Sequence, residues 1–312
     1  MLTENEPFMT IRASATALHR RLDFASALSP ALRGMLWMTL AGLVFTFLNT
    51  TMRLLAQHIA PFETQFLRYF CGMLVMVPLV MRSGFASYSP NGLSGQLWRG
   101  VVHTSGLLLW FIALPHISLA DMTALGFTSP IFIMFGAALV LKERMRMDRM
   151  LAAGIGFFGV LIVVYPNLNG QGGIYNLAML ASSPLFAASF LITKALTRRD
   201  RPEVIVVWQS ITVSLFSLPF ALLDWIWPSP LEWVAFVVCG VLGSTGHYCM
   251  TRALRTTDIS ATQSVKFLDL VWNATAGFLV FSDVPTHTTL LGGFVIFLAT
   301  SWIARREARN RA

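Results

Sequence analysis

The stretch MLWMTLAGLVFTFLNTTMRLL, residues 35–55, decides the class of this protein, because its only charged residue is Arg53. An apolar run of about 20 residues is long enough to cross a hydrocarbon core about 30 Å thick as a helix. Similar runs recur along the chain, which is 55% hydrophobic and only 12% charged. A soluble domain carries about 25% charged residues. The sequence therefore predicts an all-α integral membrane protein.

Short polar or Pro/Gly segments separate the apolar runs and divide the chain into ten predicted transmembrane helices. Between them lie breakers such as Ala60-Pro61 and Pro228-Ser229-Pro230. The predicted spans are 35–55, 62–81, 98–115, 118–141, 149–165, 174–194, 203–224, 231–251, 258–281 and 286–304.

The basic residues support this number of spans independently of hydropathy. With ten spans, 20 of the 23 lysines and arginines fall in the two tails or in loops on one side, and Arg99 is counted in the loop after span two. The other three, Arg53, Arg68 and Lys266, fall within spans. Because cytosolic loops are rich in Lys and Arg, we expect both termini to be cytosolic and the chain to cross the cytoplasmic (inner) membrane many times.

An internal repeat appears when the chain is shifted against itself by 140 residues, which brings Glu63 onto Glu203. We call this displacement the repeat shift, and positions related by it are called equivalent. It also brings the glycines at 100 and 106 onto Gly240 and Gly246. The repeat shift predicts a cytosolic tail over 1–34, five-helix repeats over 35–165 and 174–304, and a basic cytosolic tail over 305–312.

Five is an odd number of spans, so the second repeat must enter the membrane from the opposite side. The predicted fold is therefore ten transmembrane helices in two inverted five-helix repeats. Inverted repeats are typical of secondary transporters, which hold one site at the midplane and open it alternately to either side. This geometry predicts a carrier for a small organic metabolite.

Several stretches of the first half resemble the EamA-type repeat of the drug/metabolite transporter superfamily, as found in bacteria. They are ALPHISLADMTAL at 113–125, SPIF at 129–132, LKER at 141–144 and GIGFFGVLI at 154–162. The second half resembles the same repeat in ALR at 253–255, VW at 271–272, GFLVFSDVP at 277–285 and RRE at 305–307.

The resemblance implies transport of an amino acid, a nucleotide-derived cofactor, a vitamin or a drug-like compound. It also implies that spans one, three, four, six, eight and nine enclose the central cavity. The ninth span differs from the usual family pattern, because Lys266 and Asp269 stand where many relatives carry uncharged residues.

Ionisable residues inside a membrane usually face a cavity or a partner, because they are costly in lipid. Lys266 and Asp269 are three residues apart and so share one helix face. We expect Lys266 to contact an anionic group of the substrate and Asp269 to be the candidate for proton coupling. The alternative is an internal structural ion pair.

Further candidates for the substrate site lie within the predicted spans. Histidines could relay protons, or could simply be buried and hydrogen-bonded. Aromatic rings could stack on a planar substrate, or could pack against lipid. Polar groups could bind substrate, or could bond neighbouring helices. The candidates are His103, His247, Trp110, Phe127, Tyr248, Asn49, Thr123 and Gln263.

Two further predictions concern structure rather than binding. Arg68, Glu63 and Asp121 lie toward the same predicted outer side and are expected to form a packing ion pair. Pro130 and Pro184 interrupt backbone hydrogen bonding within spans and are candidate hinges.

Other functions have weaker support in the sequence. The basic residues form no helix or aromatic platform for a nucleic acid, so none is expected as a partner. No metal site or cofactor is expected, because Cys71, Cys239 and Cys249 lack ligand spacing. An intramembrane enzyme, or a receptor or assembly subunit without transport, remains the alternative. The expected partners are a small-molecule substrate and the lipid bilayer, and the chain is expected to be a monomer or homodimer.

Overall fold

The computed structural model describes residues 28–117, 119–126, 128–142, 147–164, 173–282 and 287–309. These residues form α-helices and one short 3-10 helix, η1 (Phe85–Tyr88), and they contain no strand. The predicted all-α class is thus confirmed for the described chain. The helices are α2 (Pro30–Leu55), α3 (Pro61–Ser83), α4 (Leu93–Ala113), α5 (Leu119–Gly126), α6 (Thr128–Leu139), α7 (Met147–Val164), α8 (Gly173–Leu196), α9 (Pro202–Ala221), α10 (Pro230–Thr256), α11 (Ile259–Lys266), α12 (Leu268–Phe281) and α13 (His287–Arg309).

Ser-Pro pairs begin two of the longest helices. The Ser29 hydroxyl accepts from the Leu32 backbone N–H at 3.0 Å ahead of α2, and Ser229 forms a capping box with Glu232 ahead of α10. Proline fits the first helical position because it has no N–H to leave unbonded there. These signals start both helices earlier than the apolar runs alone suggest.

Two predicted spans are each divided into two helices. Residues 118–141 contain α5 and α6, and residues 258–281 contain α11 and α12, which meet at Phe267. The two divisions are equivalent, since the repeat shift brings the start of α6 at Thr128 onto the start of α12 at Leu268. The divided helices therefore occupy the same place in each half of the sequence.

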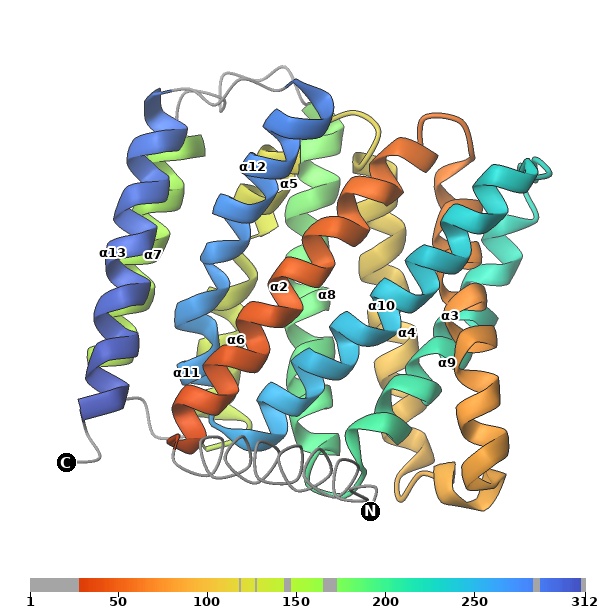
Figure 1. Ribbon diagram of the computed structural model, residues 1–312, viewed down its shortest axis with the longest axis horizontal. Helices are drawn as coiled ribbons and strands as arrows, with labels where there is room; N and C mark the ends of the chain where they lie inside the picture. The colour runs from red at the N-terminus through yellow and green to blue at the C-terminus, as the bar shows by residue number, and fades with distance from the viewer. Residues whose placement is uncertain are drawn as a thin grey trace, which may run out of the picture.

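Helix packing follows the repeat shift as well. The closest neighbours are α2 with α10, α4 with α8, α3 with α9, and α7 with α13 (Figure 1). The shift converts α2 into α8 and α4 into α10, so the first two pairs are equivalent. In each remaining pair, the shift converts one helix into the other. The contacts between helices thus show the same repeat as the sequence.

Equivalent glycines allow the equivalent helices to approach closely. A Cβ on Gly240 of α10 would lie 2.6 Å from the Gly72 backbone nitrogen of α3. A Cβ on Gly100 of α4 would lie 2.5 Å from the Thr212 side chain of α9. Positions 72 and 212 are themselves equivalent, so both contacts occur at the same register.

The helices α2 and α8, which are equivalent under the repeat shift, run in opposite directions in Figure 1. There α2 rises from the lower edge of the molecule, whereas α8 descends from the upper edge. The described chain begins and ends at the lower edge, at the start of α2 and the end of α13. The side where α2 begins is accordingly named the lower edge, and the side where α3 begins is named the upper edge.

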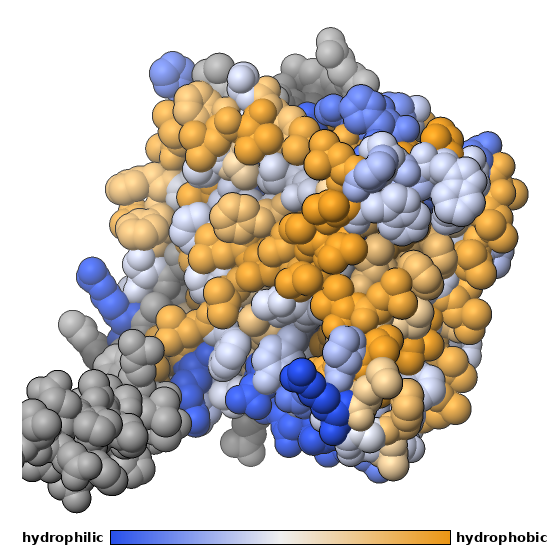
Figure 2. Space-filling model, turned by 45° about the vertical axis from the view of Figure 1, so that its right-hand side comes forward, coloured by the Kyte–Doolittle hydropathy of each residue, from blue (hydrophilic) through white to orange (hydrophobic). Residues whose placement is uncertain are grey.

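The outer surface is apolar over most of its height. Among the described residues, six helical segments are long and apolar enough to cross a membrane: α2, α3, α9, α10, the Ile174–Leu196 part of α8 and the Ala261–Phe281 run. Large side chains such as Phe47, Leu215 and Phe294 are more than half exposed. Figure 2 shows a broad apolar area across the middle of one face, with hydrophilic residues toward the upper and lower edges. Such a belt is suited to contact with lipid.

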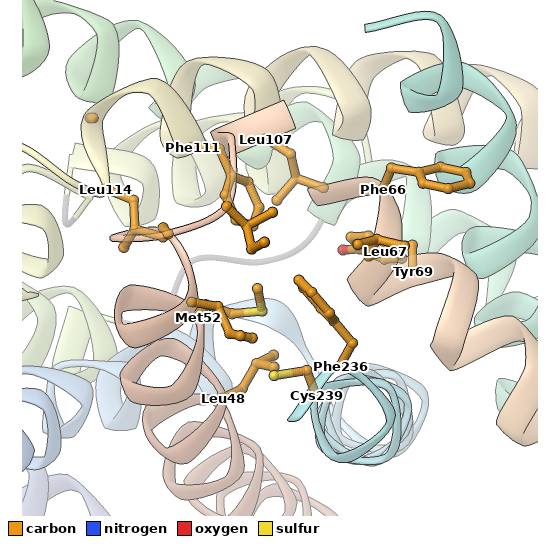
Figure 3. Close-up of a cluster of buried hydrophobic side chains, with 14 of the residues drawn as sticks. Leu48, Met52, Phe66, Leu67, Tyr69, Leu107, Phe111, Leu114, Phe236 and Cys239 are labelled. Carbon is orange, nitrogen blue, oxygen red and sulfur yellow. The ribbon is translucent and has the colours of Figure 1, made fainter. Parts of the chain in front are cut away.

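The interior also contains close apolar packing. Leu48 and Met52 of α2, Phe111 of α4 and Phe236 of α10 are fully buried in one cluster. Figure 3 shows these side chains converging between the helices. This cluster fixes α2 and α10 beside α4, and so positions the polar side chains that these helices carry toward the interior.

Candidate functional site

A cavity of about 230 Å³ lies in the middle of the helical bundle. Its walls belong to α2, α4, α5, α6, α8, α10, α11 and α12, the helices that correspond to spans one, three, four, six, eight and nine. The lining residues are Phe45, Asn49, Arg99, His103, Trp110, Leu119, Met122, Gly126, Ser129, Ile133, Met179, Phe186, Ser189, Phe190, Thr193, His247, Met250, Lys266, Asp269 and Asn273.

Half of these residues form equivalent pairs under the repeat shift. Both halves of the sequence therefore contribute the same positions to the wall, although most pairs differ in chemistry. The pairs are Asn49 and Ser189, Trp110 and Met250, Gly126 and Lys266, Ser129 and Asp269, and Ile133 and Asn273.

Lys266 and Asp269 stand on either side of the division between α11 and α12. The Lys266 ammonium lies 5.9 Å from the ring centroid of Phe190, and the Asp269 carboxylate lies against Gly42 of α2. Only a residue without a side chain at position 42 leaves room for the carboxylate there. No ion pair within 4.0 Å joins these two described side chains. Both charges therefore face the cavity without neutralising each other directly.

Arg99 is a third charged group in the cavity wall, and the expectation that it lies in a loop is wrong. Helix α4 begins at Leu93, so Arg99 lies two turns inside the helix and is only 1% exposed. Its guanidinium donates to the Ile205 carbonyl at 3.1 Å and to the Gln209 side-chain oxygen at 2.6 Å. The helix starts in the polar loop before the apolar run, which is why hydropathy misplaced this residue.

His103 and His247 belong to one buried hydrogen-bonded network. The Tyr69 hydroxyl lies 2.9 Å from His103 Nε2 and 3.2 Å from His247 Nε2. Ser189 Oγ lies 3.1 Å from His103 Nδ1, and the Gln209 amide nitrogen lies 3.4 Å from His247 Nδ1 and 3.3 Å from His247 Nε2. The two histidines are thus bonded to side chains, and neither is a lone buried residue.

The donors in this network can be assigned for neutral imidazole rings. Because Arg99 donates to Gln209 Oε1, the amide nitrogen of Gln209 donates to His247. In the tautomer where Nδ1 of His247 accepts this proton, His247 donates from Nε2 to the Tyr69 oxygen, and Tyr69 donates to His103 Nε2. His103 in turn donates from Nδ1 to Ser189 Oγ, which leaves the Ser189 proton available to a group in the cavity.

Two other predicted site residues lie outside the cavity lining. Gln263 is fully buried in α11, and both polar atoms of its side chain lack a hydrogen-bond partner among the described residues. Tyr248 packs edge-to-face against Trp37, with ring centroids 6.3 Å apart. Phe127 and the Thr123 side chain lie outside the described part of the structure.

The predicted ion pair between Glu63 and Arg68 is not formed. Glu63 accepts from the Ile226 backbone N–H at 2.9 Å, and the Arg68 guanidinium lies 4.6 Å from the Tyr69 ring centroid. Residues five apart point in different directions around a helix, whereas neighbours on one face are three or four apart. The Asp121 side chain, the third member, lies outside the described side chains.

Of the two candidate hinges, Pro184 lies within the continuous helix α8, and the Pro130 side chain is not described. Their part in any motion stays a prediction. Among the described residues, no three His, Cys, Asp or Glu side chains gather as metal ligands. The cavity therefore offers two cations, one carboxylate, aromatic rings and hydroxyl or amide groups for a small polar molecule.

An apolar belt around a helical bundle is typical of a multi-pass membrane protein, and the polar cavity inside it suits a small-molecule ligand. The EamA-like transporter family matches the chain twice, over residues 32–165 and 173–305. This chain belongs to that family, and the predicted family and its function in transporting a small metabolite are confirmed.

The most similar relatives include transporters with different named substrates. The chain is 33% identical to a riboflavin transporter of Rhizobium johnstonii, over 90% of this chain and 94% of the relative. It is 27% identical to an S-adenosylmethionine uptake transporter of Rickettsia prowazekii, over 91% and 96%. It is 28% identical to a pseudopaline exporter of Pseudomonas aeruginosa, over 88% and 96%.

A solved crystal structure shares the fold at low sequence identity. It superimposes with a TM-score of 0.69 and 18% identity, covering 86% of this chain and 98% of that chain.

Proposed function

We propose that this protein is a secondary transporter that carries a small organic metabolite by alternating access through the central cavity. The observation that carries the proposal is the pairing of cavity residues at equivalent positions of the two halves, such as Ser129 with Asp269. A site shared by two equivalent halves can be exposed to either side when those halves exchange conformations.

The architecture proposed for this mechanism is ten transmembrane helices in two inverted five-helix repeats, over 35–165 and 174–304. The opposite directions of α2 and α8 support the inversion (Figure 1). The equivalent contacts of α2 with α10 and of α8 with α4 support the pseudo-two-fold relation. Segments α5–α6 and α11–α12 then each count as one divided span.

We place the lower edge in the cytosol of a bacterial cell and the protein in its inner membrane. Basic residues gather there at the ends of α3, α8 and α10, as in Arg82, Arg198 and Arg255. Positive residues favour the cytosolic side. In this orientation both termini are cytosolic. Since one chain encloses the whole cavity, a monomer suffices for transport, and a homodimer would contain two separate cavities.

In the proposed site, Lys266 and Arg99 attract an anionic or electron-rich group of the substrate. Asp269 accepts a donor group or carries a coupled proton. Trp110, Phe186 and Phe190 supply aromatic surface for a planar or apolar part of the substrate. Planar riboflavin, the charged S-adenosylmethionine and pseudopaline, named for the relatives, are therefore suitable first compounds to test.

We propose transport without covalent chemistry, with energy from a proton gradient, solute exchange or the gradient of the substrate itself. The test is uptake by liposomes that contain the purified protein, using labelled riboflavin, S-adenosylmethionine and a panel of amino acids. Uptake that saturates and is lost in a Lys266→Met variant is expected. Uptake equal to that of protein-free liposomes for every compound, or conversion of a compound into product, would contradict the proposal.

A further inference from the structure

A second pocket opens at the upper edge, beside the start of α3, the end of α4, the start of α8 and the end of α9. Its volume is about 250 Å³. Two carboxylates, Glu63 and Asp224, contribute to its wall together with the rings of Phe62, Tyr175 and Phe220. We call it the upper pocket. It is distinct from the central cavity, because the two share none of their described lining residues.

Glu63 gives the upper pocket a carboxylate with unused capacity for hydrogen bonding. Its side chain is fully buried, and Oε2 accepts from the Ile226 backbone N–H at 2.9 Å. Oε1 has no hydrogen-bond partner among the described residues. Burial of an unpaired ionised oxygen is costly, so a donor brought by a ligand would be stabilised there.

The equivalent place at the lower edge shows which kind of donor is missing. The repeat shift converts Glu63 into Glu203 and Ile112 into Arg252. Glu203 and Arg252 are both charged neighbours of Tyr248. The Arg252 guanidinium also lies 5.7 Å from the Trp37 ring centroid and 6.0 Å from that of Tyr248. At the lower edge the chain itself therefore provides a cation beside an acid and aromatic rings.

The upper pocket has the acid and the rings without the cation. None of its described lining residues is a lysine or an arginine, and its one described imidazole is that of His116. Arg53, at the upper end of α2, lies instead over Phe281, with its guanidinium carbon 4.3 Å from the ring centroid. His116 stacks on Tyr175 at 3.8 Å between centroids. One face of Tyr175 is thus covered by His116, and an ammonium group could contact a carboxylate and the remaining aromatic surface of the pocket.

We propose that the upper pocket binds a small organic cation, with a primary ammonium group between Glu63 and Asp224 and an apolar body against Phe62, Tyr175 and Phe220. An organic cation fits better than a metal ion, since the described part of the chain has no three-ligand group and the walls are largely aromatic. The ammonium would take the place that Arg252 occupies at the other edge. This site goes beyond the proposed transport function.

The test uses 2-phenylethylammonium as the probe, titrated calorimetrically into the full chain in detergent. We expect saturable binding, and binding at least about tenfold weaker for the neutral analogue 2-phenylethanol. Glu63→Gln should weaken probe binding at least about tenfold, because the amide keeps an acceptor for Ile226 but loses the charge. Asp224→Asn, on an exposed side chain, should weaken it about threefold.

Two matched variants locate the probe. Glu203→Gln, at the equivalent position of the lower edge, and Asp269→Asn, in the central cavity, should leave probe affinity unchanged. The proposal is overturned if the unmodified chain shows no saturable binding, or if affinity is unchanged in Asp224→Asn or in a folded Glu63→Gln variant. Loss of binding in Asp269→Asn alone would place the probe in the central cavity and equally overturn it.

The binding test is independent of the transport proposal. Probe affinity is measured on the purified chain and does not require uptake. Failure of liposome uptake with retained, Glu63-dependent binding would remove only the transport mechanism. Normal uptake without probe binding would remove only the upper pocket as a cation site.

Discussion

The two halves of the molecule differ most where they meet at the cavity. The first half contributes Gly126, Ser129 and Ile133 to the wall, and the second half contributes Lys266, Asp269 and Asn273 at the equivalent positions. Helix packing, by contrast, keeps glycine at positions 100 and 240. The comparison indicates that duplication preserved the contacts of the scaffold, while at these three equivalent wall positions the charged groups belong to the second half.

This asymmetry has a structural basis in the neighbouring helices. Asp269 can lie against α2 because position 42 is glycine, whereas the equivalent position in α8 is Ser182, which is fully buried. Ser129 instead donates to the Ser183 carbonyl at 3.2 Å. Ser129 thus bonds α6 to α8, whereas Asp269 remains available to the cavity.

The largest expected effect concerns the scaffold that both halves share. Gly240→Ala should place a methyl group against the backbone of Gly72 and Cys71, which cannot move aside easily. Gly100→Ala meets Cβ and Oγ1 of Thr212 at 2.5 Å, and of these two atoms only Oγ1 can rotate away. Overpacking costs about 1–3 kcal/mol, and we expect Gly240→Ala at the upper end of that range and Gly100→Ala below it. Thermal unfolding of both variants in detergent measures the difference.

Equal midpoints for Gly240→Ala and the unmodified chain would show that α3 and α10 are not in close contact at this register. Gly154→Ala is a suitable control, because a Cβ on Gly154 meets no atom within 4 Å among the described residues.

Much of the scaffold could be predicted from the sequence. The apolar runs identified the helices, and the repeat shift identified the equivalent positions. The division at Phe267 was missed, because hydropathy continues across it. The Ser-Pro starts at 29–30 and 229–230 were also available as signals that extend the helices beyond the apolar runs.

The site was only partly predictable. Lys266 and Asp269 stood out because charge is rare in an apolar run. Arg99 was misplaced because it lies next to a polar loop, where a charge looks ordinary. Tyr69 and Gln209 were missed, although the repeat shift makes them equivalent. Their role depends on contacts with histidines that lie far away in sequence, and no local pattern reports such contacts.

The second prediction tests whether the charge at position 266 is essential. Lys266→Met should lower transport at least about tenfold, because a hydrogen bond to a charged group contributes about 1.5–3 kcal/mol. Gly126→Ala, at the equivalent position, should change transport less than about twofold, since among the described residues its Cβ would meet only the flexible end of Met179 at 3.3 Å. Uptake per reconstituted molecule is the measurement. Similar losses in both variants would contradict an asymmetric site.

The third prediction concerns Asp269 and the space that α2 leaves for it. Asp269→Asn should lower transport about three- to tenfold, since the amide keeps the shape and loses the charge. Gly42→Ala should have a similar but smaller effect, because the methyl group would displace the carboxylate. Ser129→Ala, in the first half, serves as the control and should keep at least about half the activity. Full transport by Asp269→Asn would exclude the carboxylate as a proton carrier.

The smallest expected effect concerns the two ends of the cavity. At the lower edge the Lys194 ammonium donates to the Leu254 carbonyl at 2.7 Å and to the Thr257 carbonyl at 2.6 Å, and so ties the end of α8 to the end of α10. The equivalent residue at the upper edge is Leu54, which is 44% exposed and provides no such donor. The lower edge is therefore held by polar bonds that the upper edge lacks at this position.

If the halves alternate, loss of this tie should favour opening at the lower edge. The assay measures how fast an impermeant maleimide, added from the lower side, labels a Thr193→Cys side chain. Lys194→Met should raise this rate about threefold, since a net hydrogen bond contributes about 0.5–1.5 kcal/mol. Leu54→Met, in the same Thr193→Cys background, should leave the rate unchanged. The native cysteines are buried, so their labelling should be slow. An unchanged rate in Lys194→Met would mean that the lower edge opens elsewhere, and that the difference between the edges does not set the resting conformation.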